Sequence, residues 1–119
     1  MPLLRLETSV ALTDDTRKAL LASLSKAMAE TIGKPEQYVM ITVSPAAIRM
    51  SGQDGAAAFA EIRSIGGLNE AVNRRLSQRV CKLLTESLGL APDRVYLNFA
   101  EVKAANWGWN GGTFAAGGS

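Results

Sequence analysis

The chain repeats itself at an offset of 56 residues, and this self-similarity restricts the fold more than any other feature. Three pairs of segments match: Glu30–Gly33 with Glu86–Gly89, Val39–Val43 with Val95–Phe99, and Leu4–Thr8 with Ala60–Ser64. Apolar and polar residues alternate in the last two pairs, as in half-buried strands. The repeat therefore predicts one structural unit used twice.

A helix is predicted between the two strands of each copy. In the first copy Thr13 suits the N-cap and Gly33 the left-handed position that ends the helix. In the second copy Gly89 ends the helix. The apolar stripes at helical spacing are Leu20, Leu21, Leu24, Ala27, Met28 and Ile32, and then Leu68, Val72, Leu76, Val80, Leu83, Leu84 and Leu88.

The element order is thus β-α-β followed by β-α-β, within one domain spanning residues 1–119. The copies cover about residues 2–43 and 58–99, and a tail covers 104–119. Because a β-α-β crossover favours parallel strands, we expect an α/β (α+β) fold with a four-stranded sheet and two helices on one face. Residues 44–58 are expected to form a loop, and the tail a short strand around Trp107–Trp109 and a mobile end at 115–119.

The second face of such a sheet has no cover within one chain. Depending on register, it carries Leu4 or Arg5, with Met40, Tyr96 and Asn98. A sheet must bury an apolar face against something, and self-association in a closed ring would achieve this.

Composition excludes several classes of function. The net charge of +2 is small and spread over the chain, so nucleic acid is not an expected partner. The chain has no histidine and one cysteine, Cys81, so no metal site or cofactor is predicted. No segment resembles a signal peptide or a membrane span, and the cytoplasm is the expected location, with leaderless export left open.

The order of several short motifs resembles the macrophage migration inhibitory factor family, part of the tautomerase superfamily. These motifs run from Pro2 to about Ala115: Met1-Pro2 opening a strand, Gly33-Lys34-Pro35-Glu36-Gln37-Tyr38, Ser64-Ile65-Gly66, Pro92-Asp93-Arg94-Val95-Tyr96-Leu97-Asn98, and Ala104-Ala105-Asn106-Trp107-Gly108-Trp109-Asn110 with Thr113-Phe114-Ala115. The resemblance implies a homotrimer in which three sheets form an inner barrel. It also implies keto-enol tautomerisation of phenylpyruvate-like, and dopachrome-like, aromatic keto acids.

Pro2 is the catalytic base that the resemblance implies, once Met1 is removed. A free α-amino group has a reference pKa near 7.7–8.0, and burial in an apolar pocket lowers it further. A neutral amine can then accept a proton from a carbon next to a carbonyl. Proline is also common at position 2 without any catalytic role.

The remaining site residues follow from the same resemblance. Lys34 is expected to face the substrate carboxylate, and the backbone of Ile65 to contact the carboxylate or hydroxyl. Tyr96 and Asn98 share one face of a strand and are expected to line the pocket of a neighbouring subunit. Trp109 and Phe114 are expected to desolvate Pro2 and stack on the substrate. Each of them could instead be an ordinary surface, core or interface residue.

Two departures from the family pattern leave a second reading open. Trp107 stands where a smaller apolar residue is usual, and a larger ring there would narrow the pocket. The Cys-x-x-Cys of animal members reads Ala57-Ala58-Phe59-Ala60 here, so no thiol-disulfide oxidoreductase activity is expected. The alternative function is a cytokine-like module that binds a receptor protein and retains a vestigial pocket.

Overall fold

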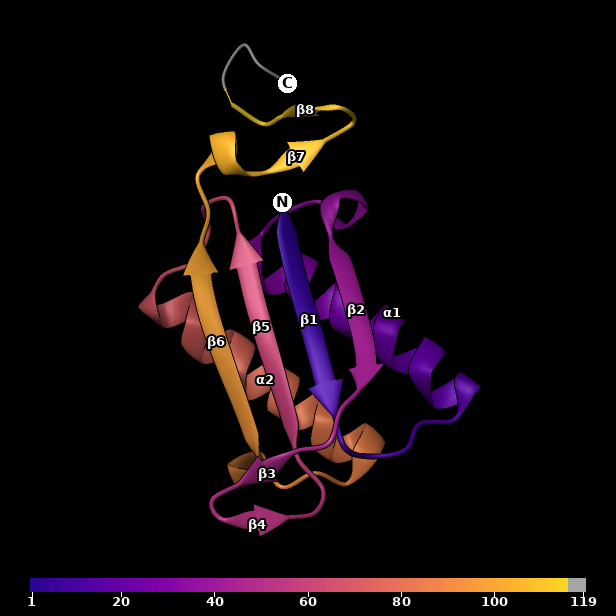
Figure 1. Cartoon of the computed structure of the whole chain (residues 1–119). Helices are drawn as coiled ribbons and strands as arrows, with labels where there is room; N and C mark the ends of the chain where they lie inside the picture. Colours follow the sequence, from indigo (N-terminus) through magenta and orange to yellow (C-terminus); the bar gives the residue numbers. More distant parts are fainter. Residues whose placement is uncertain (116–119) are drawn as a thin grey trace.

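The computed structural model describes residues 1–115 as a four-stranded mixed sheet backed by two long helices (Figure 1). The elements in chain order are β1 (Pro2–Thr8), α1 (Asp14–Ile32), η1 (Glu36–Tyr38), β2 (Met40–Pro45), β3 (Arg49–Met50), β4 (Gln53–Asp54), β5 (Ala58–Ser64), α2 (Glu70–Leu88), η2 (Pro92–Arg94), β6 (Val95–Glu101), η3 (Ala104–Asn106), β7 (Gly108–Trp109) and β8 (Gly112–Thr113). The predicted α+β class is confirmed.

The internal repeat is reproduced to the residue. Strand β5 begins and ends 56 positions after β1, and α2 begins and ends 56 positions after α1. The sheet order is β2-β1-β5-β6, with β1 parallel to β2, β5 parallel to β6, and β1 antiparallel to β5. Each copy is therefore one β-α-β unit, and the two units meet at the central β1–β5 pair.

Matching caps bound the two helices. Thr13 Oγ1 accepts a hydrogen bond from the Thr16 N–H at 3.1 Å, and Gly33 ends α1 with a φ of 80°. Both features were predicted. In α2 the N-cap is Asn69, whose Oδ1 accepts from the Val72 N–H at 2.9 Å, and Gly89 ends the helix with a φ of 70°. Within residues 1–115 neither helix is long and apolar enough to cross a membrane.

The start of the second helix differs from the prediction. Leu68 was expected to open its apolar stripe, but α2 begins at Glu70 after the Asn69 cap. Leu68 is nevertheless buried, because it lies just before the cap and packs on the core. The apolar contact was predicted correctly, and the helical position was wrong.

The core lies between the helices and one face of the sheet. Leu4 and Leu6 of β1 and Ile62 of β5 are fully buried there, against helix side chains such as Leu24 and Leu76. Burial of each such side chain contributes roughly 1.5–3 kcal/mol. Leu4 therefore points toward the helices, which settles the register that the sequence left open.

The opposite face of the sheet is open and carries a chain of charges. Arg5 lies 3.6 Å from the carboxylate of Glu61, and Arg63 Nε lies 3.2 Å from the same group. Apolar side chains flank these charges: Met40 and Tyr96 are 61% and 65% exposed. This face of the chain therefore combines ion pairs with exposed apolar surface.

Two hairpins lie at opposite ends of the sheet (Figure 1). Residues 44–58 are more regular than expected, because β2 extends to Pro45 and β3 pairs with β4. In the tail the predicted short strand is β7, which pairs with β8. The expectation of mobility at 115–119 falls largely on residues 116–119, which lie outside the described part of the chain.

Candidate active site

Several segments converge at the end of the sheet where the chain begins. Pro2, the first residue of β1, lies opposite Ser64, the last residue of β5, and its neighbour Leu3 pairs with Met40 at the start of β2. The β7–β8 hairpin stands beyond this end, close to the N-terminus in Figure 1. The fold thus gathers residues from the beginning, the middle and the end of the sequence around Pro2.

A cavity of about 220 Å³ occupies this place, and aromatic and apolar side chains dominate its walls. Pro2, Trp109 and Phe114, three of the predicted site residues, line it together. Its full lining is Met1, Pro2, Gln37, Tyr38, Val39, Met40, Trp107, Gly108, Trp109 and Phe114. An apolar recess with few polar groups is typical of small-molecule sites.

The tail hairpin supplies the aromatic wall. The rings of Trp109 and Phe114 stack with centroids 5.6 Å apart and an interplanar angle of 18°. The Phe114 N–H donates to the Trp107 carbonyl at 3.2 Å, which ties the far arm of the hairpin to its near arm. Because Trp109 is 57% exposed, one side of the stack remains accessible to a ligand.

The chain's amino group lies at the same end of the sheet. In the structure the amine belongs to Met1, and the Pro2 nitrogen is part of the peptide bond. Partial burial lowers the pKa of the Met1 ammonium below its ordinary value of 8.0, and the positive charge of Lys34 lowers it further. Pro2 itself is fully buried. A terminal amine one residue further in would meet the same two influences.

Lys34 approaches this amine from the helix-covered side of the sheet. It directly follows Gly33, and its N–H donates to the Ala29 carbonyl at 3.1 Å. A Cβ added to Gly67 would lie 3.4 Å from Lys34 Cε and 2.8 Å from Ile32 Cγ2. The bare glycine therefore leaves room for the lysine stem. Lys34 does not line the cavity, but its charge acts on the amine beside it.

Ile65 lies just beyond β5, next to the Ser64 position that faces Pro2. The Ser64 hydroxyl donates to the Gly66 carbonyl at 2.7 Å, and the Val102 N–H donates to the Ser64 carbonyl at 2.9 Å. These two bonds fix the backbone on either side of Ile65. Its side chain is half-buried, so its place beside the site is set by backbone geometry.

Tyr96 and Asn98 are not brought to Pro2 within one chain. Both lie on the open face of β6, where Tyr96 pairs with Phe59 and Asn98 with Glu61. These partners precede Ser64 on β5 by five and three residues, which is roughly 17 Å and 10 Å along a strand. One protomer therefore assembles the amine, the lysine and the aromatic wall without these two residues.

Sequence reasoning missed part of the lining. Gln37, Tyr38, Val39 and Met40 border the cavity from η1 and the start of β2, although none was predicted as a site residue. A signal was present, because the strands of a β-α-β unit begin at the same edge of the sheet. Trp107, expected only to narrow the pocket, lines the cavity itself.

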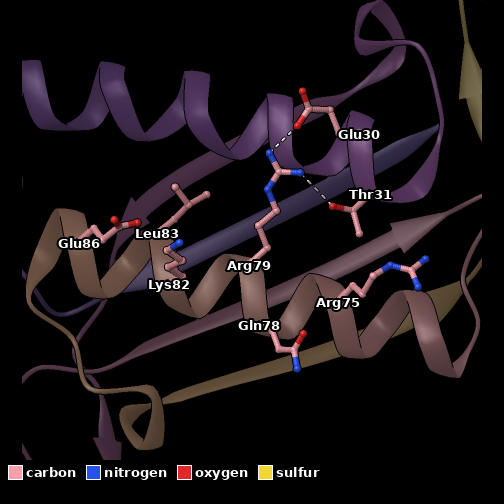
Figure 2. Close-up of a pocket in the computed structure, with 8 residues that line it drawn as sticks. All are labelled: Glu30, Thr31, Arg75, Gln78, Arg79, Lys82, Leu83 and Glu86. Carbon is pink, nitrogen blue, oxygen red and sulfur yellow. Dashed lines mark hydrogen bonds and ion pairs between the residues drawn. The ribbon is translucent and has the colours of Figure 1, made fainter.

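A larger hollow, about 670 Å³, lies between the outer faces of the helices and is lined mainly by charged side chains (Figure 2). Arg79 of α2 occupies its centre, with hydrogen bonds to Glu30 Oε1 at 2.5 Å and Thr31 Oγ1 at 3.3 Å. This groove has neither the amine nor an aromatic wall. The smaller cavity at Pro2 is thus the better candidate, despite its size.

The chemistry available at this cavity is proton transfer beside a cation. A partly buried amine and an ammonium lie next to an apolar recess that would exclude water from a bound aromatic ligand. In residues 1–115 no cluster of three or more His, Cys, Asp or Glu side chains could hold a metal ion.

Comparison with known proteins points to one family. The family model described as macrophage migration inhibitory factor matches residues 1–115. The macrophage migration inhibitory factor of Meriones unguiculatus is 38% identical over 97% of this chain and 100% of its own length. Among solved structures, the homologue from Prochlorococcus marinus is 37% identical with a TM-score of 0.90, covering 95% of this chain and 99% of that one. The Entamoeba histolytica protein is 34% identical with a TM-score of 0.91, covering 95% and 98%.

Proposed function

Because this chain belongs to the macrophage migration inhibitory factor family, we propose that it is a keto-enol tautomerase of aromatic 2-keto acids such as phenylpyruvate. The family and the tautomerase-superfamily fold support an isomerase in general. The substrate and the base are our proposal. The observation that carries it is Pro2, buried at an aromatic cavity beside an amine whose pKa is lowered.

In the proposed reaction the Pro2 nitrogen acts as base after removal of Met1. The neutral secondary amine takes a proton from C3 of phenylpyruvate, and the electron pair released from that C–H bond forms the C2=C3 double bond. The C2 carbonyl oxygen gains negative charge and is protonated to give the enol. The reverse sequence returns the proton from the prolinium to C3.

Lys34 and the aromatic wall support this transfer in different ways. The ammonium of Lys34 pairs with the substrate carboxylate and favours the developing enolate. It also keeps the amine neutral, because a neighbouring positive charge disfavours the protonated form. Trp109 and Phe114 hold the phenyl ring and exclude water, and the backbone of Ile65 contacts the carboxylate.

The site is completed by a second copy of the chain in the proposed homotrimer. Tyr96 and Asn98 lie on the open sheet face, which carries the exposed Met40 and has no cover within residues 1–115. Sheets packed around a threefold axis would bury this face and bring the two side chains to a neighbour's Pro2. Asn98 would then offer a donor and an acceptor, and Tyr96 a ring and a hydroxyl.

The test is conversion of phenylpyruvate between its enol and keto forms. Protein whose mass confirms loss of Met1 is compared with protein that retains it, and with processed Pro2→Gly. We expect turnover only from the processed wild-type protein, with Pro2→Gly slower by about a hundredfold or more and still trimeric. Equal rates for Pro2→Gly and wild type would remove Pro2 as the base.

A second candidate is a cytokine-like mediator, favoured by the name that the curated relatives carry. Its partner would be a receptor protein bound at the outer surface, with the cavity as a vestige. Receptor binding should then survive Pro2→Gly. The absence of affinity for any family receptor in a direct binding assay would count against it.

A further inference from the structure

A second hollow of about 260 Å³ adjoins the Pro2 cavity on the open side of the sheet. It is lined by Leu3, Arg63, Val102, Asn106, Trp107 and Gly108. Trp107 and Gly108 line the Pro2 cavity as well, so the two hollows meet at the start of the tail hairpin. A ligand anchored at the amine can therefore extend past the Trp107 ring into the second hollow.

Arg63 brings a positive charge into this second hollow. It pairs with Leu3, the residue after Pro2, and points to the open face of the sheet. Its Nε lies 3.2 Å from Glu61 Oε1, and its side chain is 49% exposed. That contact engages one edge of the guanidinium and leaves the fork of its two Nη atoms for another acceptor.

Two cations thus flank the amine from opposite faces of the sheet. Lys34 lies on the helix-covered side, and Arg63 lies on the open side beyond Trp107. We propose that Arg63 is a specificity-determining residue, which favours 2-keto acids that carry a second carboxylate at the end remote from the keto group. This inference rests on the proposed tautomerase function, because it assumes that the keto-acid end binds at Pro2 and Lys34.

A carboxylate matches the second hollow better than a more highly charged group. Arg63 is the one charged residue that lines it, and Asn106 is the other polar side chain in the lining. A guanidinium fork binds the two oxygens of a planar carboxylate side by side. The Trp107 ring between the two charged ends suits an aromatic spacer, so the substrate class is an aromatic 2-keto acid with a distal carboxylate.

The experiment compares kcat/KM for phenylpyruvate and for 4-carboxyphenylpyruvate, using processed trimeric protein. We expect the ratio of the two values to favour the dicarboxylate in wild type and to fall about tenfold in Arg63→Gln, with Arg63→Lys between them. Arg5→Gln is the matched control, because Arg5 contacts the same Glu61 but does not line the hollow. Its ratio should equal that of wild type.

A binding measurement separates failure of this inference from failure of the proposed function. Trp107 and Trp109 are the chain's two tryptophans, so intrinsic fluorescence reports on this region alone. Terephthalate should bind more tightly than benzoate, and Arg63→Gln should abolish that difference. If phenylpyruvate is not turned over but this difference appears, the reaction is wrong and the carboxylate site stands. Equal affinities in wild type, or an equal loss of preference in Arg5→Gln, would overturn the role of Arg63.

Discussion

Trp109 stacks on Phe114 across the tail hairpin, with ring centroids 5.6 Å apart. The hairpin has only two paired positions, so this contact and the bond from the Phe114 N–H to the Trp107 carbonyl give it much of its definition. Because both rings line the Pro2 cavity, the shape of the tail and the dryness of the amine depend on the same contact.

Phe114→Ala should therefore raise both KM for phenylpyruvate and the pKa of the terminal amine. An aromatic pair contributes about 0.5–1.5 kcal/mol beyond burial, so the rise in KM should be up to about tenfold. Burial is the larger cause of the lowered amine pKa, and admitted water would relieve it. The midpoint of the pH profile of kcat/KM should move to higher pH. Phe114→Leu keeps an apolar cover and should move it less.

Lys34→Gln should move the same midpoint to higher pH for a different reason. The lysine charge disfavours the protonated amine, so its removal raises the amine pKa and delays the appearance of the neutral base as pH rises. Salt tests the cause, because screening should shift wild type toward the variant and leave the variant unmoved. Lys26→Gln, on the exposed side of α1, should leave the midpoint unchanged. An equal shift in both variants would contradict a local effect.

Gly67→Ala should destabilise the fold more than Gly66→Ala. Both glycines have positive φ, 84° and 71°, so each substitution carries about 1–2 kcal/mol of backbone strain. Only the Gly67 methyl would meet neighbours, at 2.8 Å from Ile32 Cγ2 and 3.4 Å from Lys34 Cε. We expect about 1–3 kcal/mol more loss of unfolding free energy at Gly67, measured by urea denaturation. Equal losses would show that Ile32 gives way freely.

Glu30→Gln should lower the thermal midpoint at neutral pH and have little effect in acid. The hydrogen bond from Arg79 holds the pKa of the Glu30 carboxyl below its ordinary value of 4.5. A lowered folded-state pKa gives stability that is present above about pH 4.5 and is lost as pH falls through the folded value. Glu86→Gln is the control, since Glu86 lines the same groove with no ion pair in residues 1–115 (Figure 2). A difference that persists at low pH would contradict the ion pair as its source.

Local chemistry made most of the fold predictable. The caps Thr13 and Gly33 and the 56-residue offset placed the helices and the strands, because each signal depends only on neighbours in sequence. The facing of β1 was less certain, since two leucines in succession hide the alternation until Arg5. The β3–β4 hairpin gave no periodic signal, because each of its strands has only two residues.

The site was predictable in a different measure. Resemblance named Pro2, Trp109 and Phe114, and the structure brings them to one cavity. Burial of Pro2 and the influence of Lys34 on the amine depend on packing between distant segments, which no local pattern encodes. The distance of Tyr96 from Pro2 within one chain follows from strand register, and register is set by the whole sheet.

The repeat has a consequence for how many reactive ends this architecture can offer. Ala58 occupies the place in the second half that Pro2 occupies in the first, at the opposite end of the sheet, since it pairs with Thr8. A hairpin stands beyond each end. However, the Ala58 nitrogen is bonded to Ala57 and can never be a free amine. A duplicated and fused chain is thus symmetric in shape and asymmetric in reactivity, with one nucleophilic terminus where two separate halves would have had two.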